Sequence, residues 1–366
     1  MTRRTSRAPT VPFSAVIAKR SFADKVRARC GAAWRAVATV WLASAAALPA
    51  AAQTAPSMPP PAPPQASPGR IWAPRQAPGY YRFELGDFEV IALLDGTHPF
   101  PATELAVGAR PGEVAELLAQ NFLTSPVEGG FSAFLIRMPS KLVLIDTGAG
   151  DLYGRDGGLL VANLRAAGIA PEQIDEIYLT HLHRDHVGGL LMRGKIVFPR
   201  AIVRVAQVEA DFWLNDANRT KVPAFLGSMF DGAQQCLKPY IAQGRFRPYA
   251  EGEALVPGIT AIAAPGHTPG HHQYLVESRG KALLVWGDTV HVAPVQLPDP
   301  HVAMKYDTDP AAAVRSRETA FAAAAGKGWW VAGAHLSFPG LGHVRHAAPG
   351  SYAWIPANYA LNRMPQ

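Results

Sequence analysis

Residues 179–189 read LTHLHRDHVGG. The segment before them, residues 174–179, has the β-branched and aromatic content of a buried strand, and the two closing glycines favour a turn. The stretch therefore places three histidines and one aspartate in a tight turn at a strand end: His181, His183, Asp185 and His186. Imidazole and carboxylate groups together suit zinc-like divalent ions, and other first-row metals remain open. The alternative, a histidine-rich surface turn, gives no reason for four ligating side chains within six residues behind a buried strand.

The H-x-H-x-D-H spacing resembles the signature loop of the metallo-β-lactamase superfamily. That resemblance implies three more metal ligands, and three later segments match in family order: PGHTPGH at 265–271, VWGD at 285–288 and GAH at 333–335. By resemblance, one metal is held by His181, His183 and His267. The other is held by Asp185, His186 and His335, with Asp288 bridging the two.

The resemblance also implies chemistry. Two divalent ions, most simply zinc, would lower the pKa of a shared water and supply a hydroxide nucleophile near neutral pH. Asp185 and Asp288 are the candidate catalytic carboxylates, and the net positive site would attract the oxyanion formed on attack. The acid that protonates the leaving group is left open between Asp185 and water. No cysteine lies in the metal motifs, which argues against the lactamase subgroup that uses one.

The expected fold is α/β, the family's αββα sandwich of two facing β-sheets with outer helices. Periodicity and turn signals predict a hairpin over residues 80–94 and a loop-rich segment over 215–250. Helices are predicted over 111–122, 159–167, 208–214 and 309–325. Further strands are predicted over 131–138, 142–145, 174–180, 202–206, 259–263, 273–276, 282–286 and 329–332.

A nearer resemblance, over about residues 79–359, is to the methyl parathion hydrolase group of secreted di-zinc hydrolases. Long segments support it, including ADFWL at 210–214, DTD at 307–309 and HLSFPGLGH at 335–343. Aromatic side chains line the pocket in that group, which implies pocket positions for Trp213, Tyr153 and Phe225. His291 is a further pocket candidate.

Asp146, in the turn Asp146-Thr147-Gly148, is expected by resemblance to lie beneath the metal loop and to orient a ligand by hydrogen bonding. The function expected is hydrolysis of lactones or aryl esters, with phosphotriesterase activity beside it. A primarily organophosphate-cleaving enzyme and a non-catalytic metal-binding protein on the same fold are the alternatives.

The N-terminal region reads as a targeting segment. A basic stretch precedes 13 residues without a charge, 36–48, and an A-x-A site ends at Ala52. Residues 1–52 are therefore predicted to be a signal peptide, residues 53–78 a proline-rich linker, and residues 79–366 the hydrolase domain. The protein is therefore expected to be periplasmic or secreted, and both the Sec and the twin-arginine export routes are left open.

The formal net charge of +7 comes from the predicted leader, which holds nine of the 35 Lys and Arg and one of the 28 Asp and Glu. The rest of the chain is close to neutral, which disfavours nucleic acid as a partner. The apolar run at residues 36–48 is too short to cross a bilayer stably. The expected partner is a small ester, lactone or phosphotriester, and a homodimer is left open. Cys236 stands alone outside the leader, so no intramolecular disulfide is expected there.

Overall fold

Two six-stranded sheets form the centre of the fold in the computed structural model, which describes residues 76–359. The predicted signal peptide and nearly all of the predicted linker lie outside these residues. The first sheet has the order β1 (Tyr80–Leu85), β2 (Phe88–Phe100), β4 (Val127–Arg137), β5 (Leu142–Ile145), β6 (Glu176–Tyr178) and β9 (Ile202–Arg204). The second has the order β10 (Ile259–Ala263), β11 (His272–Ser278), β12 (Lys281–Val285), β14 (Trp330–Ala332), β15 (Leu341–Ala348) and β16 (Ser351–Pro356).

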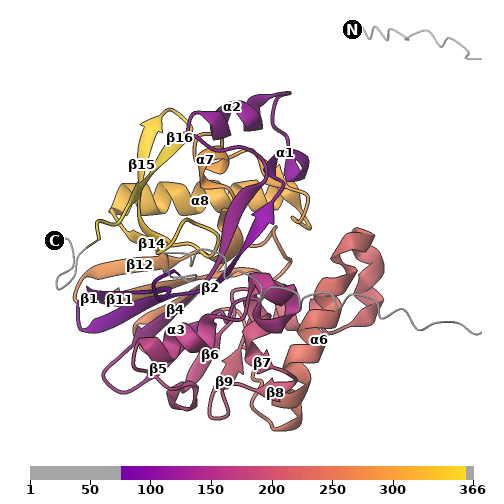
Figure 1. Ribbon diagram of the computed structural model, residues 1–366, viewed down its shortest axis with the longest axis vertical. Helices are drawn as coiled ribbons and strands as arrows, with labels where there is room; N and C mark the ends of the chain where they lie inside the picture. Colours follow the sequence, from indigo (N-terminus) through magenta and orange to yellow (C-terminus); the bar gives the residue numbers. More distant parts are fainter. Residues whose placement is uncertain (1–75, 360–366) are drawn as a thin grey trace, which may run out of the picture. The chain divides into compact units, whose positions relative to one another are not determined.

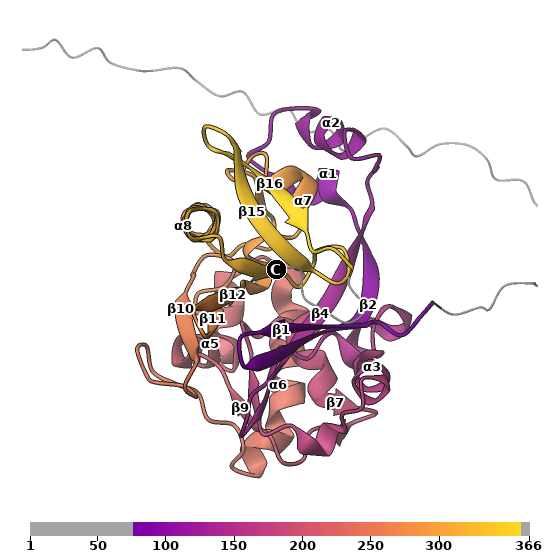
Figure 2. The same ribbon diagram turned by 90° about the vertical axis from the view of Figure 1, so that its left-hand side faces the viewer.

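Helices flank both sheets, with α3 beside the first and α8 beside the second (Figure 1; Figure 2). The helices are α1 (Ala102–Leu105), α2 (Glu113–Ala119), α3 (Leu160–Ala166), α4 (Arg184–Val187), α5 (Gln207–Trp213), α6 (Gly227–Ala242), α7 (Ala293–Gln296) and α8 (Pro310–Lys327). Two small ladders pair β3 (Ala106–Val107) with β13 (Ala303–Met304), and β7 (Leu191–Met192) with β8 (Lys195–Ile196). The expected αββα architecture is confirmed.

Side-chain alternation along the strands explains the layers, because successive residues of a strand point to opposite faces. In β2, Val90 and Ala92 join the apolar cluster shared by the two sheets, whereas Ile91 and Leu93 join the cluster that contains α3 and α6. In β12, Leu284 joins the α8 cluster instead. Three apolar layers therefore hold two sheets and their outer helices together.

Helix α8 has sequence signals at both ends. The Asp309 carboxylate accepts a hydrogen bond from the Ala312 N–H, Pro310 occupies the first turn, and Gly328 ends the helix in the left-handed conformation. The predicted helix over 309–325 is thus confirmed with a slightly later end. Among residues 76–359, no helix is both long and apolar enough to cross a bilayer.

The prediction of a loop-rich segment over residues 215–250 is wrong for its second half, where the 16-residue helix α6 lies. Gly232 and Pro239 inside the helix lower its intrinsic propensity and hid it. A Cβ at Gly232 would lie 2.6 Å from Cγ of Arg184, so this glycine lets α6 pack closely on α4. The β15–β16 hairpin was also not anticipated from the sequence.

A β-bulge between Leu94 and Gly96 interrupts the β2–β4 ladder at Asp95. Asp95 is fully buried, and its carboxylate accepts four backbone N–H bonds of 2.9–3.0 Å from a single loop. The donors are Ala149, Gly150, Gly158 and Leu160. Burial raises the pKa of Asp95, and these four bonds work in the opposite direction. Asp95 therefore fixes both ends of the 149–160 loop to the first sheet.

We predict that Asp95→Ala lowers the free energy of unfolding by about 3–5 kcal/mol, because it leaves four buried N–H groups without an acceptor. Asp95→Asn should cost less, since its amide oxygen still accepts on one side while its NH2 group opposes the donors on the other. Urea denaturation of both variants measures this. Asp231→Asn, at an exposed helix position, is the matched control, and an Asp95→Ala loss no larger than that of the control would refute the clamp.

Candidate metal centre

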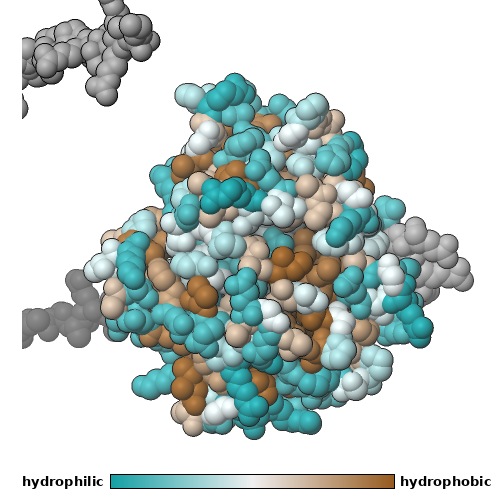
Figure 3. Space-filling model, turned by 180° about the vertical axis from the view of Figure 1, so that it is seen from behind, coloured by the Kyte–Doolittle hydropathy of each residue, from teal (hydrophilic) through white to brown (hydrophobic). Residues whose placement is uncertain are grey.

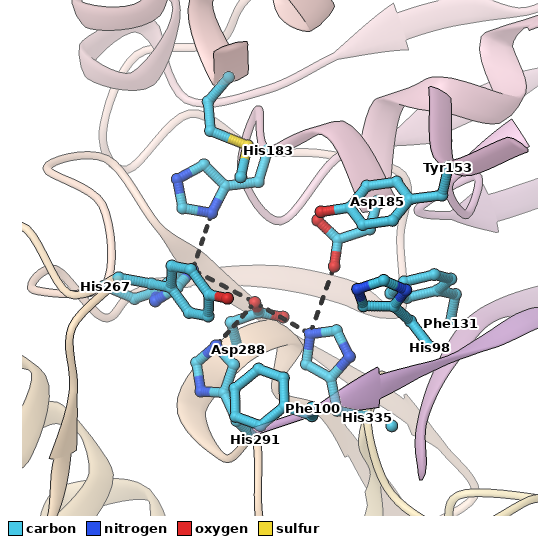
Figure 4. Close-up of a pocket in the computed structure, with 13 residues that line it drawn as sticks. His98, Phe100, Phe131, Tyr153, His183, Asp185, His267, Asp288, His291 and His335 are labelled. Carbon is cyan, nitrogen blue, oxygen red and sulfur yellow. Dashed lines mark hydrogen bonds and ion pairs between the residues drawn. The ribbon is translucent and has the colours of Figure 1, made fainter. Parts of the chain in front are cut away.

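The seven expected ligands come from four strand ends that meet at one edge of the sandwich. The loop after β6 carries His181 and His183, and α4 carries Asp185 and His186. The loops after β10, β12 and β14 carry His267, Asp288 and His335 respectively. Figure 4 shows several of these side chains converging on Asp288.

The seven side chains form two groups that share Asp288. One group contains His181, His183, His267 and Asp288, the other contains Asp185, His186, Asp288 and His335, and in each the potential ligand atoms lie within 4.8 Å of one another. The Asp288 carboxylate lies 2.9 Å from His186 Nε2, 3.2 Å from His267 Nε2 and 3.1 Å from His335 Nε2. This division is the one that the family resemblance implies.

Unpaired buried atoms show that the cluster fits metal ions. Within residues 76–359, nine buried side-chain N or O atoms lack a well-aligned hydrogen-bond partner, and three of them belong to the ligand groups: Nε2 of His181 and His186 and Oδ1 of Asp288. His183 meets its group through Nδ1, which lies 3.0 Å from His267 Nε2. Orphaned buried polar atoms are costly unless something binds them. Burial, assisted by neighbouring histidines, holds the pKa values of His181 and His183 well below the usual range, which favours the neutral form that binds metal.

Asp146 lies beneath the metal loop. Its Oδ2 is 2.9 Å from His186 Nδ1 and accepts a 2.9 Å bond from the Thr180 hydroxyl, while its Oδ1 accepts from the Thr180 N–H at 2.8 Å. The Thr180 hydroxyl in turn lies 3.0 Å from His181 Nδ1. Asp146 thus fixes one histidine of each group, and its backbone adopts φ 61° to do so.

Three further outward contacts, which were not predicted from the sequence, orient ligands. His267 Nδ1 lies 2.9 Å from Asp307 Oδ1, and His335 Nδ1 donates to the Gly130 carbonyl at 2.8 Å. His271 accepts the Asp288 N–H at Nε2, which requires its proton on Nδ1, where it donates to the Ala264 carbonyl. Burial, reinforced by His267, lowers the pKa of His271 to about 3, consistent with that neutral acceptor.

Glu209 ties two metal loops together from beneath. Its fully buried carboxylate accepts bonds from the Leu182 N–H at 2.9 Å, the Thr268 hydroxyl at 2.7 Å and the Gly270 N–H at 2.9 Å. A Cβ at Gly270 would lie 2.4 Å from the Glu209 nitrogen, so only glycine fits there. Burial raises the pKa of Glu209 to about 7, although the three hydrogen-bond donors act to lower it.

A cavity opens over the two groups, with an empty volume of about 550 Å³ that includes open solvent. Besides metal-group residues, its walls contain His98, Phe100, Gly129, Phe131, Tyr153, Met229, His291 and Tyr306 (Figure 4). Tyr153 and His291, both predicted to lie in the pocket, are among these wall residues. His291 Nε2 lies 3.1 Å from Asp288 Oδ2 and its Nδ1 has no partner.

Trp213 and Phe225 lie elsewhere. Trp213 is fully buried in the α5–α6 cluster, with its ring centroid 4.9 Å from that of His183, so it supports a ligand from behind and does not line the cavity. Phe225 is 51% exposed and contacts the rim residue Tyr306 at a 5.9 Å centroid distance. Trp213 packs against Phe230 of α6, a helix that the local sequence did not reveal.

Residues 128–335 match the family model of the metallo-beta-lactamase superfamily, which covers more than half of the chain. The chain belongs to this superfamily. The finer resemblance to the methyl parathion hydrolase group stays a prediction.

Solved structures of similar proteins include hydrolases. The hydrolase AbOPH of the beta-lactamase superfamily is 38% identical, with a TM-score of 0.75 over 78% of this chain and 100% of that chain. AidC, a dizinc quorum-quenching lactonase in complex with the product N-hexanoyl-L-homoserine, is 28% identical, with a TM-score of 0.72 over 77% of this chain and 99% of that chain.

Two curated relatives match over shorter spans. An N-acyl homoserine lactonase from a Bacillus species is 26% identical over 48% of this chain and 65% of its own length. The ribonuclease TTHA0252 from Thermus thermophilus is 29% identical over 46% of this chain and 37% of its own length. The matched part is therefore less than two thirds of either curated relative.

We predict that Asp307→Ala weakens metal binding at the His267 group by about 10- to 100-fold, because His267 loses the carboxylate that fixes its ring and tautomer. Zinc titration against a competing chromogenic chelator measures the change. Asp309→Ala, which removes a helix cap two residues away, is the matched control for local stability. Equal zinc affinity in wild type and Asp307→Ala would refute the orienting role.

Proposed function

We propose that this protein is a hydrolase with two divalent metal ions, most simply zinc, that opens lactones or cleaves aryl esters. The observation that carries the proposal is Asp288, a buried carboxylate common to two ligand groups at the base of an aromatic-lined cavity. Similarity to a dizinc lactonase over nearly its whole length supports the same reaction class. Bound together, such ions lower the pKa of a shared water and polarise the attacked carbonyl.

The chain's own residues hold and orient the reactants. His181, His183 and His267 would hold one ion, Asp185, His186 and His335 the other, and Asp288 both. Phe100, Phe131, Tyr153 and Tyr306 offer ring surfaces that exclude water from the acyl or aryl part of a substrate. His291 adds a polar group to this wall, where it can hydrogen-bond a carbonyl or ring oxygen.

Phosphotriester hydrolysis is the second candidate, because the same nucleophile attacks phosphorus and the same aromatic walls accept an aryl group. His291 favours lactone or aryl-ester hydrolysis, since a bulky aryl dialkyl phosphate prefers an apolar surface at that position. We also propose export to the periplasm or the medium, on the basis of the N-terminal sequence.

We expect activity to depend on the shared carboxylate and its histidine ligands. His183→Ala and Asp288→Ala should each lower kcat/KM for an aryl ester by several orders of magnitude, because each empties or displaces a metal. Chelation should abolish turnover, and zinc should restore full turnover in the wild type but not in these two variants. His346→Ala, an exposed strand position, is the control. Full activity in the chelated, metal-free wild type would end the proposal.

The substrate preference is tested at His291. We predict that wild type prefers dihydrocoumarin-like lactones or acyl-homoserine lactones over a methyl paraoxon-like triester. His291→Leu should shift the ratio of kcat/KM values toward the triester by roughly 5- to 150-fold, the worth of one well-placed hydrogen bond. A wild type that already prefers the triester, with a ratio unchanged by the substitution, would favour the phosphotriesterase alternative.

A further inference from the structure

A histidine in the wall of the cavity, outside both metal groups, contacts an aspartate. His98, near the end of β2, lines the cavity, and its Nδ1 lies 2.7 Å from Asp156 Oδ2. Both side chains are 40% exposed, so the pair is open to the cavity and solvent. With Nδ1 on the carboxylate, Nε2 is the ring nitrogen left to meet a ligand.

The fold holds this pair in position. The His98 ring packs against two aromatic side chains, with centroid distances of 6.3 Å to Phe131 and 5.3 Å to Tyr153. Opposite His98 in the ladder stands Gly129, which places no β4 side chain directly beside the His98 ring. The imidazole therefore has support on its flanks and space in front.

Asp156 is placed by the same loop that Asp95 fixes at both ends. A Cβ at Gly96 would lie 1.8 Å from the Asp156 carbonyl oxygen, so this glycine lets the loop dock directly on β2, two residues before His98. The sheet bulge, the buried carboxylate and the glycine thus all serve to bring the Asp156 carboxylate to the His98 ring. A pair built this way has the arrangement of an oriented acid–base histidine.

We propose that His98, oriented by Asp156, is the general acid that protonates the leaving oxygen of the substrate. The inference rests on the proposed hydrolase function. It assigns to His98 the task that the sequence left open between Asp185 and water.

Asp185 is poorly placed for that task. Its Oδ2 lies 3.7 Å from His186 Nε2 and 3.6 Å from His335 Nε2, within the second metal group. As a member of that group Asp185 would hold an ion, so it is not free to deliver a proton to the leaving oxygen. Figure 4 shows His98 on the side of the cavity where Asp185 and His335 meet, so it reaches the same region as a separate group.

The proton balance is complete with water as the only co-reactant. The oxygen of water forms a bond to the acyl carbon, and the bond from that carbon to the leaving oxygen breaks. The leaving oxygen keeps the electron pair and takes the proton from His98 Nε2. The proton released by the attacking water returns through solvent to His98 Nε2, and the contact of Nδ1 with Asp156 keeps the ring in place.

An acid at this position matters in proportion to the basicity of the leaving group. A nitrophenolate leaves without protonation, whereas the alkoxide of an aliphatic ester or lactone is far more basic and needs a proton as the bond breaks. His98 would therefore extend the enzyme from activated aryl esters to lactones, in agreement with the proposed substrate class.

The test is a leaving-group series of acetate esters, from p-nitrophenyl through phenyl to alkyl, with the zinc-loaded enzyme. His98→Gln should leave kcat/KM for the p-nitrophenyl ester within about 3-fold of wild type and lower that for the alkyl ester by about 100-fold or more, the range of general acid catalysis. Asp156→Asn should shift the series in the same direction by less. Zinc content and the unfolding midpoint of each variant are measured alongside.

The matched control is His301→Gln, which alters a histidine–aspartate pair with a 3.2 Å contact to Asp299 that is not among the cavity-lining residues. Its leaving-group dependence should equal that of wild type. A His98→Gln loss that is equal across the series, or no loss, would overturn the assignment and leave the proposed hydrolase standing. A wild type that hydrolyses no ester or lactone would overturn both.

Discussion

Asp288 places a carboxylate, 3% exposed, against ring nitrogens of five histidines at distances from 2.9 to 3.7 Å. Burial alone would raise the pKa of Asp288, but the surrounding histidines, His186 first, hold it well below the usual range. A buried anion of this kind requires positive charge nearby, and protonating several adjacent imidazoles at once is unfavourable. Divalent ions held between Asp288 and the histidine nitrogens that face it would satisfy both demands.

That requirement explains the buried polar groups beneath the loops. Asp146 and Asp307 accept from outward ring nitrogens, so the inward nitrogens are left free for metal. Asp95 and Glu209 act instead on the backbone, each gathering the N–H groups of irregular loops that have no sheet partner. The centre is therefore held by two kinds of buried carboxylate: those that orient ligands and those that replace missing secondary-structure hydrogen bonds.

Features that depend on residues close together in the sequence were predicted correctly. Four strand ends carry the seven ligand candidates, and the cap at Asp309 marks α8, because apolar runs, capping residues and metal spacings occupy neighbouring positions. Prediction failed where distant contacts decide. Gly232 leaves room for the Arg184 side chain, and the same glycine weakens the local helix signal of α6. Trp213 is buried in the core cluster that contains α6, which its own neighbours in the sequence do not indicate. The pairing of His267 with Asp307 spans 40 residues, and no short motif announces it.

The cavity walls depend most on such distant contacts. The bulge between Leu94 and Gly96 shifts the β2–β4 register by one residue, and a shift of one exchanges the faces that side chains occupy. His98 and Phe100 follow the bulge and reach the cavity, although the alternation earlier in β2 carries no sign of the change. A small change in the β2–β4 hairpin can therefore alter polar groups in the cavity wall, such as His98, while the metal ligands stay in place. In the proposed hydrolase, strand register and loop anchoring would therefore place the polar groups that meet the substrate, separately from the metal ligands.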